Sequence, residues 1–445
     1  MFFKNIVTYI NMETVTKNYR KALSQIIRRK AVGPKGSRSL EREDLDVIIP
    51  ALESDDVPLT TKAVFITAVI IQQKNQLEKD LLEAWKHWKD TIPETLSAFF
   101  FNNHNSGFPR VLKKVLNSQD LSANEASSAI TYLLDDKIPD YQKGVLLIGQ
   151  RLKRETFLEN KTFLRTFREA IGIQEVDVPL LVDLADPYDG YQRYPIYTPF
   201  VAALLASIGF PTYCHGLSEV APKHGDTIHK VLELAGKNPH KKSAAVAKDI
   251  ENESVGWGYI DQRECFPTLH KQLGLRDKIV KRTFLATLEK LLQPLRTSTG
   301  ANYMVAGYVH SHYRQELANL LEPQKSLDKV FVVKGMEGST QIDFRKDSKP
   351  VLVHDGNREI QEIRAVDIAY SQDNWDQQDS LAEYVLKTGT AALQGDHNTA
   401  REILVHQVSQ LISGFEPIEV TGARRKVINA IESGRALQHW QSGCL

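Results

Sequence analysis

Cationic side chains are concentrated in two stretches in the middle of the chain. Six lysines face two acids between Lys223 and Lys248, and eight basic residues face three acids between Arg263 and Arg296. The whole sequence is nearly balanced, with 56 basic and 55 acidic residues, so the charge is unevenly placed. Excess positive charge along a groove is how a protein follows a phosphate backbone. These stretches therefore predict a site for phosphorylated or polymeric anions.

Four tyrosines recur at intervals of three residues just before the first basic stretch, at Tyr188, Tyr191, Tyr194 and Tyr197. Aromatic rings beside cations are the parts of a single-strand groove, in which bases stack on the rings. Tyr191 and Tyr194 are the candidate stacking partners. The alternative, in which the four rings pack the loop itself, has equal weight.

The candidate phosphate contacts are basic residues from this loop and from both stretches: Arg193, Lys223, Lys241, Lys242, Arg276, Lys281 and Arg282. The candidate cleft residues lie around two predicted strand ends: Asp189, Gly190, Thr198, His215 and Gly216. No catalytic residue is assigned. The Cys214-His215 pair is no thiol–base couple, because neighbours in a strand point to opposite faces. His310 and His312 have no acid or cysteine at ligand spacing, so no metal site is predicted.

Alternating strands and helices position these residues. Residues 176–184 read as a buried strand, residues 200–209 as an apolar helix, and residues 211–215 and 330–333 as further strands. This alternation favours a mainly parallel sheet, whose ligands bind at the carboxyl ends of the strands. The loops at 185–194, 214–225 and 334–341 are therefore the expected walls of the site.

The segment before this sheet, residues 1–175, reads as helical and contains an internal repeat. Leu52 aligns with Leu133, Pro58 with Pro139, and Lys62 with Lys143, at one constant offset. Each copy reads as a helix, a short acidic loop with a proline, and a second helix, which is a compact helix–helix connection. Two copies are too few for a free-standing solenoid, so they predict a bundle.

The composition is that of a globular chain. The 445 residues are 42% hydrophobic and 25% charged, and the three cysteines are too few for a disulfide framework. No apolar run reaches the roughly 18 residues of a spanning helix. Residues 1–7 are interrupted by Lys4 and carry no small-residue cleavage site. These features together predict a cytoplasmic protein.

The chain from about residue 110 to 440 resembles the anthranilate phosphoribosyltransferase family. The resemblance rests on the order of short motifs at 121–126, 200–203, 215–216, 223–225, 275–276, 307–310 and 332–338. It implies an α/β fold class: a small all-helical domain and a large α/β domain with a mainly parallel sheet, forming a homodimer through the helical domain. The predicted domains are an N-terminal helical extension (1–105), a helical domain (106–175) and a phosphoribosyltransferase-like α/β domain (176–445).

The sequence departs from the family where the family holds its sugar donor. The family has a Gly-Thr-Gly-Gly-Asp loop whose backbone N–H groups approach a diphosphate, whereas residues 185–193 here contain one glycine and a proline. Cys214 stands in place of a lysine. Thr340 and Gln341 stand in place of the Asp-Glu pair that holds magnesium, which leaves Glu337. Arg276 matches the arginine that contacts the carboxylate of the aromatic acceptor.

The sequence is most similar to a paralogous branch that lacks the diphosphate loop and is associated with nucleic-acid binding. We therefore expect a nucleic-acid-binding protein with a basic cleft between its helical and α/β domains, without anthranilate phosphoribosyltransferase activity and without a cofactor. The alternative is a glycosyl or phosphoribosyl transferase on an unidentified acceptor, in which Arg193 and Lys223 hold the diphosphate and magnesium takes part. A third possibility is a scaffold whose helical repeat binds another protein.

Overall fold

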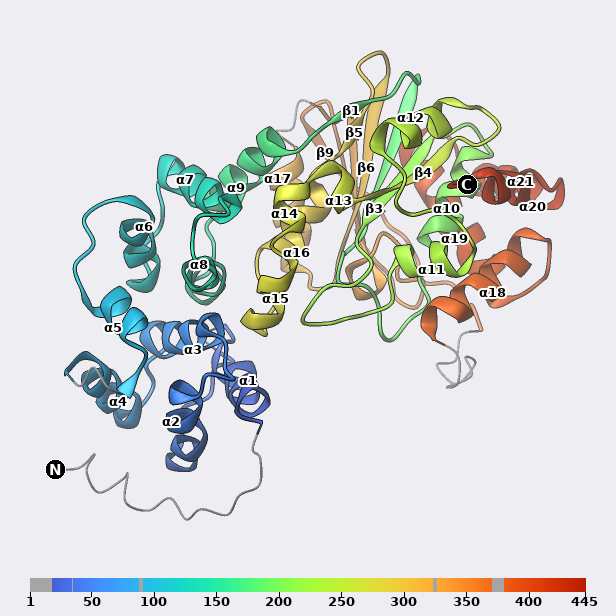
Figure 1. Cartoon of the computed structure of the whole chain (residues 1–445). Coiled ribbons are helices and arrows are strands. Elements are labelled where there is room, and N and C mark those ends of the chain that lie inside the picture. Colours follow the sequence, from blue (N-terminus) through green and yellow to red (C-terminus); the bar gives the residue numbers. More distant parts are fainter. Residues whose placement is uncertain (1–17, 34, 88–90, 323–325, 370–379) are drawn as a thin grey trace. The chain divides into compact units, whose positions relative to one another are not determined.

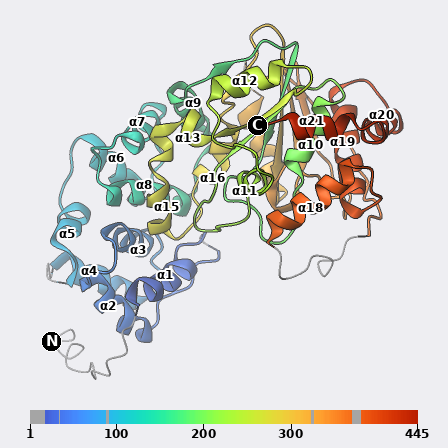
Figure 2. The same ribbon diagram turned by 45° about the vertical axis from the view of Figure 1, so that its right-hand side comes forward.

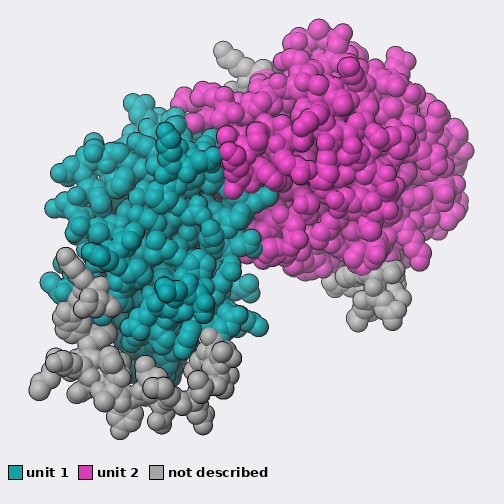
Figure 3. Space-filling view, in the orientation of Figure 1, with its two compact units in different colours: residues 1–163, 272–284 teal, residues 164–271, 285–445 magenta. Residues whose placement is uncertain are grey.

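The computed structural model describes residues 18–33, 35–87, 91–322, 326–369 and 380–445. Residues 1–7, considered above as a targeting segment, lie outside these ranges. The chain divides into two units (Figure 3): unit 1 contains residues 1–163 and 272–284, and unit 2 contains residues 164–271 and 285–445. No described helix is long and apolar enough to cross a membrane. The domain boundaries predicted at 105 and 175 stay predictions.

Unit 1 is helical. Its elements are α1 (Tyr19–Lys30), η2 (Arg42–Asp44), α2 (Leu45–Glu53), α3 (Leu59–Ile71), α4 (Gln76–His87), α5 (Glu94–Phe101), α6 (Gly107–Leu116), α7 (Ala123–Leu134), α8 (Asp140–Lys153), the first half of α9 (Phe157–Ala170) and α15 (Leu273–Ile279). The late segment belongs here because Lys143 Nζ donates to Gln272 Oε1 (3.0 Å) and Thr61 Oγ1 donates to the Lys278 carbonyl (2.9 Å).

The predicted repeat recurs in the structure as matching helices whose N-caps lie at equivalent positions. Pro58 and Pro139 precede α3 and α8, whose first residues are 81 positions apart in sequence. The helices lie against each other, and a Cβ on Gly144 would meet Thr60 Cγ2 at 2.8 Å, so only glycine allows this approach.

The two copies also share buried hydrogen bonds. The Glu78 carboxylate accepts the backbone N–H of Leu40 (2.8 Å), and the Glu159 carboxylate accepts that of Leu121 (2.9 Å). Both glutamates and both leucines are 81 positions apart, so the repeat is one of structure as well as of sequence pattern.

Unit 2 is built on a seven-stranded sheet in the order β4-β3-β2-β6-β7-β8-β9, in which the first five strands are parallel and the last two antiparallel. The strands are β2 (Leu180–Ala185), β3 (Thr212–Gly216), β4 (Trp257–Asp261), β6 (Ala301–Tyr308), β7 (Lys329–Lys334), β8 (Val351–His354) and β9 (Asn357–Ile360). The short strands β1 (Gln174–Glu175) and β5 (Leu295–Arg296) pair separately.

Helices cover this sheet, and α19, α20 and α21 gather on one side of it (Figures 1 and 2). The helices are α10 (Thr198–Ala206), α11 (Ile228–Leu234), α12 (Ser243–Glu251), α13 (Gln262–Cys265), α14 (Pro267–His270), α16 (Leu285–Leu288), α17 (His312–Leu321), α18 (Leu381–Leu393), α19 (Thr399–Phe415), α20 (Val420–Glu432) and α21 (Arg435–Ser442), with the 3-10 turns η4 (Glu289–Leu291) and η5 (Met336–Gly338).

The predicted fold class is confirmed: a helical part is joined to an α/β part with a mainly parallel sheet. The expected first strand starts later than predicted, at Leu180, because Pro179 has no N–H to give to the ladder. The expected helix over 200–209 spans Thr198–Ala206 instead. The carboxyl ends of β2, β3, β6 and β7 share one edge, where the three predicted loops begin.

Candidate functional site

Two loops cross closely at the carboxyl edge of the sheet. Tyr191 and Asp226 exchange two backbone hydrogen bonds of 2.8 Å, and the Gly225 N–H donates to the Asp189 carbonyl (3.0 Å). Gly190 has a φ of +72°, and a Cβ there would lie 2.5 Å from the Asp226 carbonyl oxygen. Gly190 is therefore required by the crossing of the loops.

A carboxylate fills the turn that this crossing forms. Glu337 lies in η5, directly after β7, and accepts the backbone N–H groups of Gln192 (3.1 Å), Arg193 (2.7 Å) and Tyr194 (3.1 Å). Successive N–H groups that point at one place form an anion-binding concavity. The loop therefore has an anion site, although it lacks the glycine-rich pattern, and the anion is the chain's own.

Two of the predicted phosphate contacts reach the same carboxylate. Lys223 Nζ lies 2.7 Å from Glu337 Oε2, and Arg193 Nε lies 3.9 Å from it. Burial alone would raise the pKa of Glu337, but the hydrogen bond and charge of Lys223 and the backbone N–H groups outweigh it and lower the pKa. Glu337 is thus an ionised, buried carboxylate in a cationic pocket, which we call the Glu337 cradle: the N–H groups of residues 192–194 with Lys223 and Arg193.

Thr340 and Gln341, at the positions of the family's magnesium pair, hold the loop by hydrogen bonds instead. Gln341 accepts the Tyr197 N–H (2.9 Å) and donates to the Pro195 carbonyl (3.0 Å). The Thr340 N–H donates to Asp186 (2.6 Å), whose other oxygen accepts the Thr198 hydroxyl. Thr198 is therefore a buried structural hydroxyl. Neither Thr340 nor Gln341 has a charge for a hard cation, so these residues do not fit a magnesium pair.

The four tyrosine side chains mostly contact other groups of the protein. The Tyr188 hydroxyl forms a hydrogen bond with His215 Nδ1, and the Tyr197 hydroxyl lies 2.9 Å from the Thr388 hydroxyl. Tyr191 is 5% exposed, with Lys223 Nζ over its ring at 5.5 Å. Tyr194 is half-buried between the guanidinium groups of Arg193 (5.7 Å) and Arg345 (4.4 Å). This placement favours loop packing over base stacking for Tyr188, Tyr191 and Tyr197.

His215 belongs to a buried polar chain beneath the loops. Its Nε2 lies 3.0 Å from Asp183 Oδ1, and the other Asp183 oxygen accepts the Tyr213 hydroxyl (2.7 Å). Burial, with the Asp183 charge, raises the pKa of Tyr213. The sulfur of Cys214 faces the Thr198 carbonyl instead, so the expected separation of Cys214 from His215 is confirmed. Sequence reasoning missed Asp183, because its partners lie on the neighbouring strand β3 and not close to it along the chain.

The remaining cleft residues are close to these groups. Asp189 is 2% exposed and its carbonyl anchors Gly225. Gly216 ends β3, where a Cβ would lie 3.3 Å from the Tyr259 hydroxyl. Both residues keep the loops close to the sheet, which is a structural role.

The other predicted phosphate contacts are dispersed. Lys241 pairs with Asp249, and Lys242 lies 2.7 Å from Glu264. Arg276, Lys281 and Arg282 belong to unit 1, where Arg276 is 6% exposed and Lys281 Nζ donates to the Arg28 carbonyl (3.0 Å). A single basic groove that joins all seven stays a prediction, and only Arg193 and Lys223 meet in the Glu337 cradle.

Comparison with known proteins gives two family matches. Residues 109–171 match a glycosyl transferase family helical bundle domain, and residues 196–437 match the a/b domain of such a family. The helical match contains the second copy of the repeat only.

Sequence relatives include two proteins described as anthranilate phosphoribosyltransferase. The one from Anaeromyxobacter sp. is 26% identical over 330 residues (74% of this chain, 95% of the relative). The one from Persephonella marina is 24% identical over 267 residues (60% and 76%). An uncharacterized protein of Aquifex aeolicus is 26% identical over 256 residues (58% and 75%).

Similar solved structures show the same fold. Anthranilate phosphoribosyltransferase from Thermus thermophilus has a TM-score of 0.60 at 18% identity, covering 74% of this chain and 97% of that one. The enzyme from Saccharomyces cerevisiae in complex with PRPP and Mg has a TM-score of 0.61 at 14% identity, covering 75% and 96%.

Proposed function

Since the chain belongs to the anthranilate phosphoribosyltransferase family of glycosyl transferases, we propose that it is a glycosyl or phosphoribosyl transferase that acts on an unidentified acceptor. The Glu337 cradle is its site for the diphosphate of the donor. One observation carries this proposal: three N–H groups and two cations converge on a single carboxylate. A phosphate oxygen accepts hydrogen bonds from the same N–H groups and cations, so a bound diphosphate displaces the Glu337 carboxylate.

The proposed chemistry follows from the charges in this pocket. In transfer, the bond between the sugar's anomeric carbon and the diphosphate breaks, and the electron pair leaves with the diphosphate. An acceptor atom bonds to the same carbon and releases its proton to water. Lys223, Arg193 and the N–H groups stabilise the negative charge that develops on the departing group. Thr340 and Gln341 do not fit magnesium, so this stabilisation is assigned to the cradle alone.

Isothermal titration calorimetry, which measures the binding of phosphoribosyl pyrophosphate and of inorganic diphosphate, tests this proposal. Glu337→Gln removes the competing charge and keeps the shape, so it is expected to bind both ligands more tightly than the unmodified protein. Lys223→Met is expected to bind them more weakly. Lys242→Met is the control, because Lys242 is an exposed lysine that also has an acidic partner.

One outcome would contradict the proposal, and another would contradict the absence of a role for magnesium. If neither the unmodified protein nor Glu337→Gln binds either ligand, the cradle is no donor site. If binding occurs but requires magnesium, the donor site includes a cation that Thr340 and Gln341 do not hold. Binding of equal strength with and without magnesium supports both.

Nucleic-acid binding, the first expectation from the charge runs, finds no support in the comparisons. The cradle accepts a polymer phosphate by the same chemistry, but Lys223, Lys241 and Lys242 each have an acidic partner here. A fluorescently labelled single-stranded oligonucleotide tests this second function. A groove that contacts several phosphates loses affinity steeply as salt rises. Absent or salt-independent binding rejects it.

A further inference from the structure

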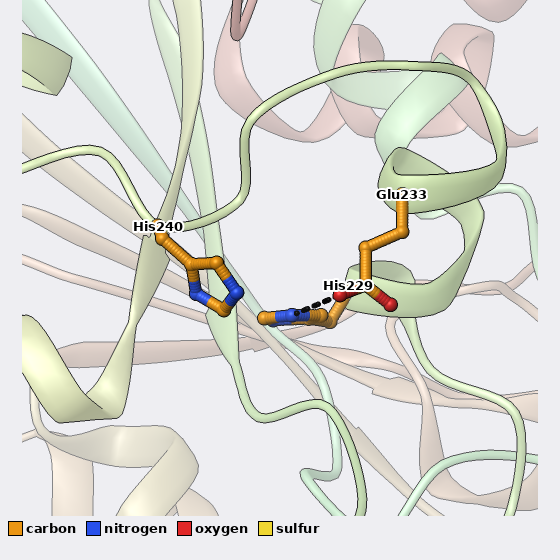
Figure 4. A group of neighbouring side chains, drawn as sticks. All are labelled: His229, Glu233 and His240. Carbon is orange, nitrogen blue, oxygen red and sulfur yellow. Dashed lines mark ion pairs between the residues drawn. The ribbon is translucent and has the colours of Figure 1, made fainter.

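A second cluster of polar side chains lies at the far edge of the same sheet, beside the carboxyl end of β4. It consists of His229 and Glu233 from α11 and His240 from the loop before α12 (Figure 4). One ligand-type atom from each lies within 4.8 Å of the others. His229 and Glu233 are four residues apart on one helix, which places them on one face.

Outer partners hold both imidazole rings in defined orientations. The Asp261 carboxylate lies 3.0 Å from His240 Nδ1 and 3.8 Å from His229 Nδ1, which also has the Tyr259 hydroxyl at 3.4 Å. The Nδ1 atoms are therefore engaged, and the Nε2 atoms remain for a ligand. A carboxylate behind the second nitrogen of a histidine is the usual outer partner of a metal-binding imidazole.

The buried Nε2 atom of His229 lacks a hydrogen bond of good geometry among the described residues. His229 is 0% exposed, and its Nε2 forms no hydrogen bond of good geometry within the described residues, although Glu233 Oε1 lies 3.3 Å away. A buried polar atom without a hydrogen bond is costly, so such an atom in a native fold calls for an explanation. A bound cation between His229 and Glu233 would provide one.

The surrounding charges favour a cation in this position. Glu233 and Asp261 contribute two carboxylates to the cluster. Arg263 offsets part of that charge, since it lies 3.4 Å from Asp261 and against Nδ1 of His240. Arg263 meets this cluster at Nδ1 of His240. The Nε2 atoms and the Glu233 carboxylate, which is half exposed, can therefore close around an ion.

We propose that His229 Nε2, His240 Nε2 and the Glu233 carboxylate bind a zinc-class divalent cation, with water in the fourth position and Asp261 as outer partner. Two imidazoles and one carboxylate suit zinc, whereas magnesium prefers oxygen ligands. Zinc ligands lie roughly 2.0–2.2 Å from the ion, so the partly exposed Glu233 and His240 move inward on binding. The ion joins α11, the following loop and the end of β4. This proposal does not depend on the Glu337 cradle.

Titration of the metal-free protein with Zn²⁺, and separately with Mg²⁺, tests the site. We expect one equivalent of Zn²⁺ to bind and Mg²⁺ not to compete. Co²⁺ in place of Zn²⁺ is expected to give the intense visible bands of a four-coordinate ion. His240→Gln and Glu233→Gln, both at partly exposed side chains, are expected to lose this binding. Asp261→Asn is expected to weaken it by about 10–100-fold.

His312→Ala is the matched control, because His310 and His312 are also neighbouring histidines, with ring centroids 6.0 Å apart, but are exposed. It is expected to bind Zn²⁺ as the unmodified protein does. Binding lost in His312→Ala and kept in His240→Gln would place the ion elsewhere and overturn the proposal. So would the absence of stoichiometric Zn²⁺ binding, or binding unaffected by both Glu233→Gln and His240→Gln. Circular dichroism of each variant separates a lost ligand from a lost fold.

Discussion

Glu337 combines an unfavourable backbone conformation with favourable hydrogen bonds of its carboxylate. Its φ of 50° lies in the left-handed region, which residues other than glycine, asparagine and aspartate seldom adopt. The carboxylate accepts three N–H groups and an ammonium, and hydrogen bonds to charged groups are among the strongest in proteins. These bonds offset the backbone strain and fix the loop after β2 to the turn after β7.

Replacing this carboxylate is expected to cost stability. Glu337→Gln leaves Lys223 without its ion pair, so we expect the free energy of unfolding at neutral pH to fall by about 1–3 kcal/mol. The pKa of Glu337 is lowered in the folded state, so its contribution is complete above the ordinary value near 4.5 and is lost as pH falls through the folded value. Urea denaturation should therefore show the two proteins converging in acid. A constant difference between pH 7 and pH 3 would refute this.

Lys281 provides a matching test at alkaline pH. Burial, with Arg151 and Arg28 nearby, lowers the pKa of Lys281 to about 8. The unfolded chain, where a lysine has a pKa of about 10.4, then holds more protons between the two values, and stability rises with pH across that window. We expect Lys281→Met to flatten the stability profile between those values. Denaturation midpoints measured at pH 7, 8, 9 and 10 check this, and parallel profiles for both proteins would contradict it.

At the scale of elements, the first copy of the repeat contains a fully buried ion pair. Lys30 Nζ lies 2.7 Å from Glu78 and 2.6 Å from the Gln72 carbonyl, and both charged side chains are inaccessible. Lys30→Met leaves the buried Glu78 carboxylate without its cation, so we expect a loss of about 3–5 kcal/mol in the free energy of unfolding. The double variant with Glu78→Gln should recover part of it. A small effect of Lys30→Met alone would mean that Leu40 and Lys74 N–H groups suffice for Glu78.

The buried lysine of α3, Lys62, should behave in the opposite way. Lys62 is 4% exposed, and burial lowers its pKa. Lys62→Met removes the cost of burying an ammonium and leaves the nearby Asp55 in solvent, since Asp55 is exposed. We therefore expect a higher melting temperature by differential scanning calorimetry. A lower one would show that the ammonium forms a net favourable contact.

The sequence was informative wherever a pattern is local. Apolar runs predicted three of the five parallel strands, β2, β3 and β7, but not β4 and β6. Pro58 and Pro139 marked equal helix starts in the two copies. The cradle could not be predicted, because Glu337 meets the N–H groups of residues 192–194 across about 145 positions, and chain separation gives no signal of such a contact. The predicted α/β domain, 176–445, also includes residues 272–284, which belong to unit 1, because an amphipathic helix does not show which surface it will meet.

The metal cluster illustrates the same limit. The sequence places His229 and Glu233 four residues apart, but that spacing alone predicts no metal site. The residues that make it a candidate, His240 and Asp261, reach it only through a loop and a strand. By contrast, the motif that did contain two histidines, at 310–312, is exposed and has no such partners among the described residues.

For the whole molecule, the repeat restricts how copies of the chain can associate. The helical unit buries α3 against α8 within one chain, so that surface is not available to a second copy. The predicted homodimer through the helical part stays a prediction and would have to use another surface.

Substitution at this internal contact tests its role. Gly144→Val introduces a side chain where a Cβ already meets Thr60 at 2.8 Å, so we expect a loss of about 1–3 kcal/mol in stability. The molar mass by light scattering should not change, because the contact lies within the chain. A change of mass with unchanged stability would instead place Gly144 at a surface between copies.

Covalent fusion of the two helical copies has an evolutionary consequence. When identical chains pair about a twofold axis, every substitution occurs on both sides at once. Here a substitution occurs in one half only, and the ion pairs of the two equivalent glutamates already differ. Glu159 takes its cation from Lys153, whereas the matching position of the first copy holds Gln72, and Glu78 takes its cation from Lys30 in α1. The halves have thus acquired separate histories within one gene product, and a substitution in one half is not repeated in the other.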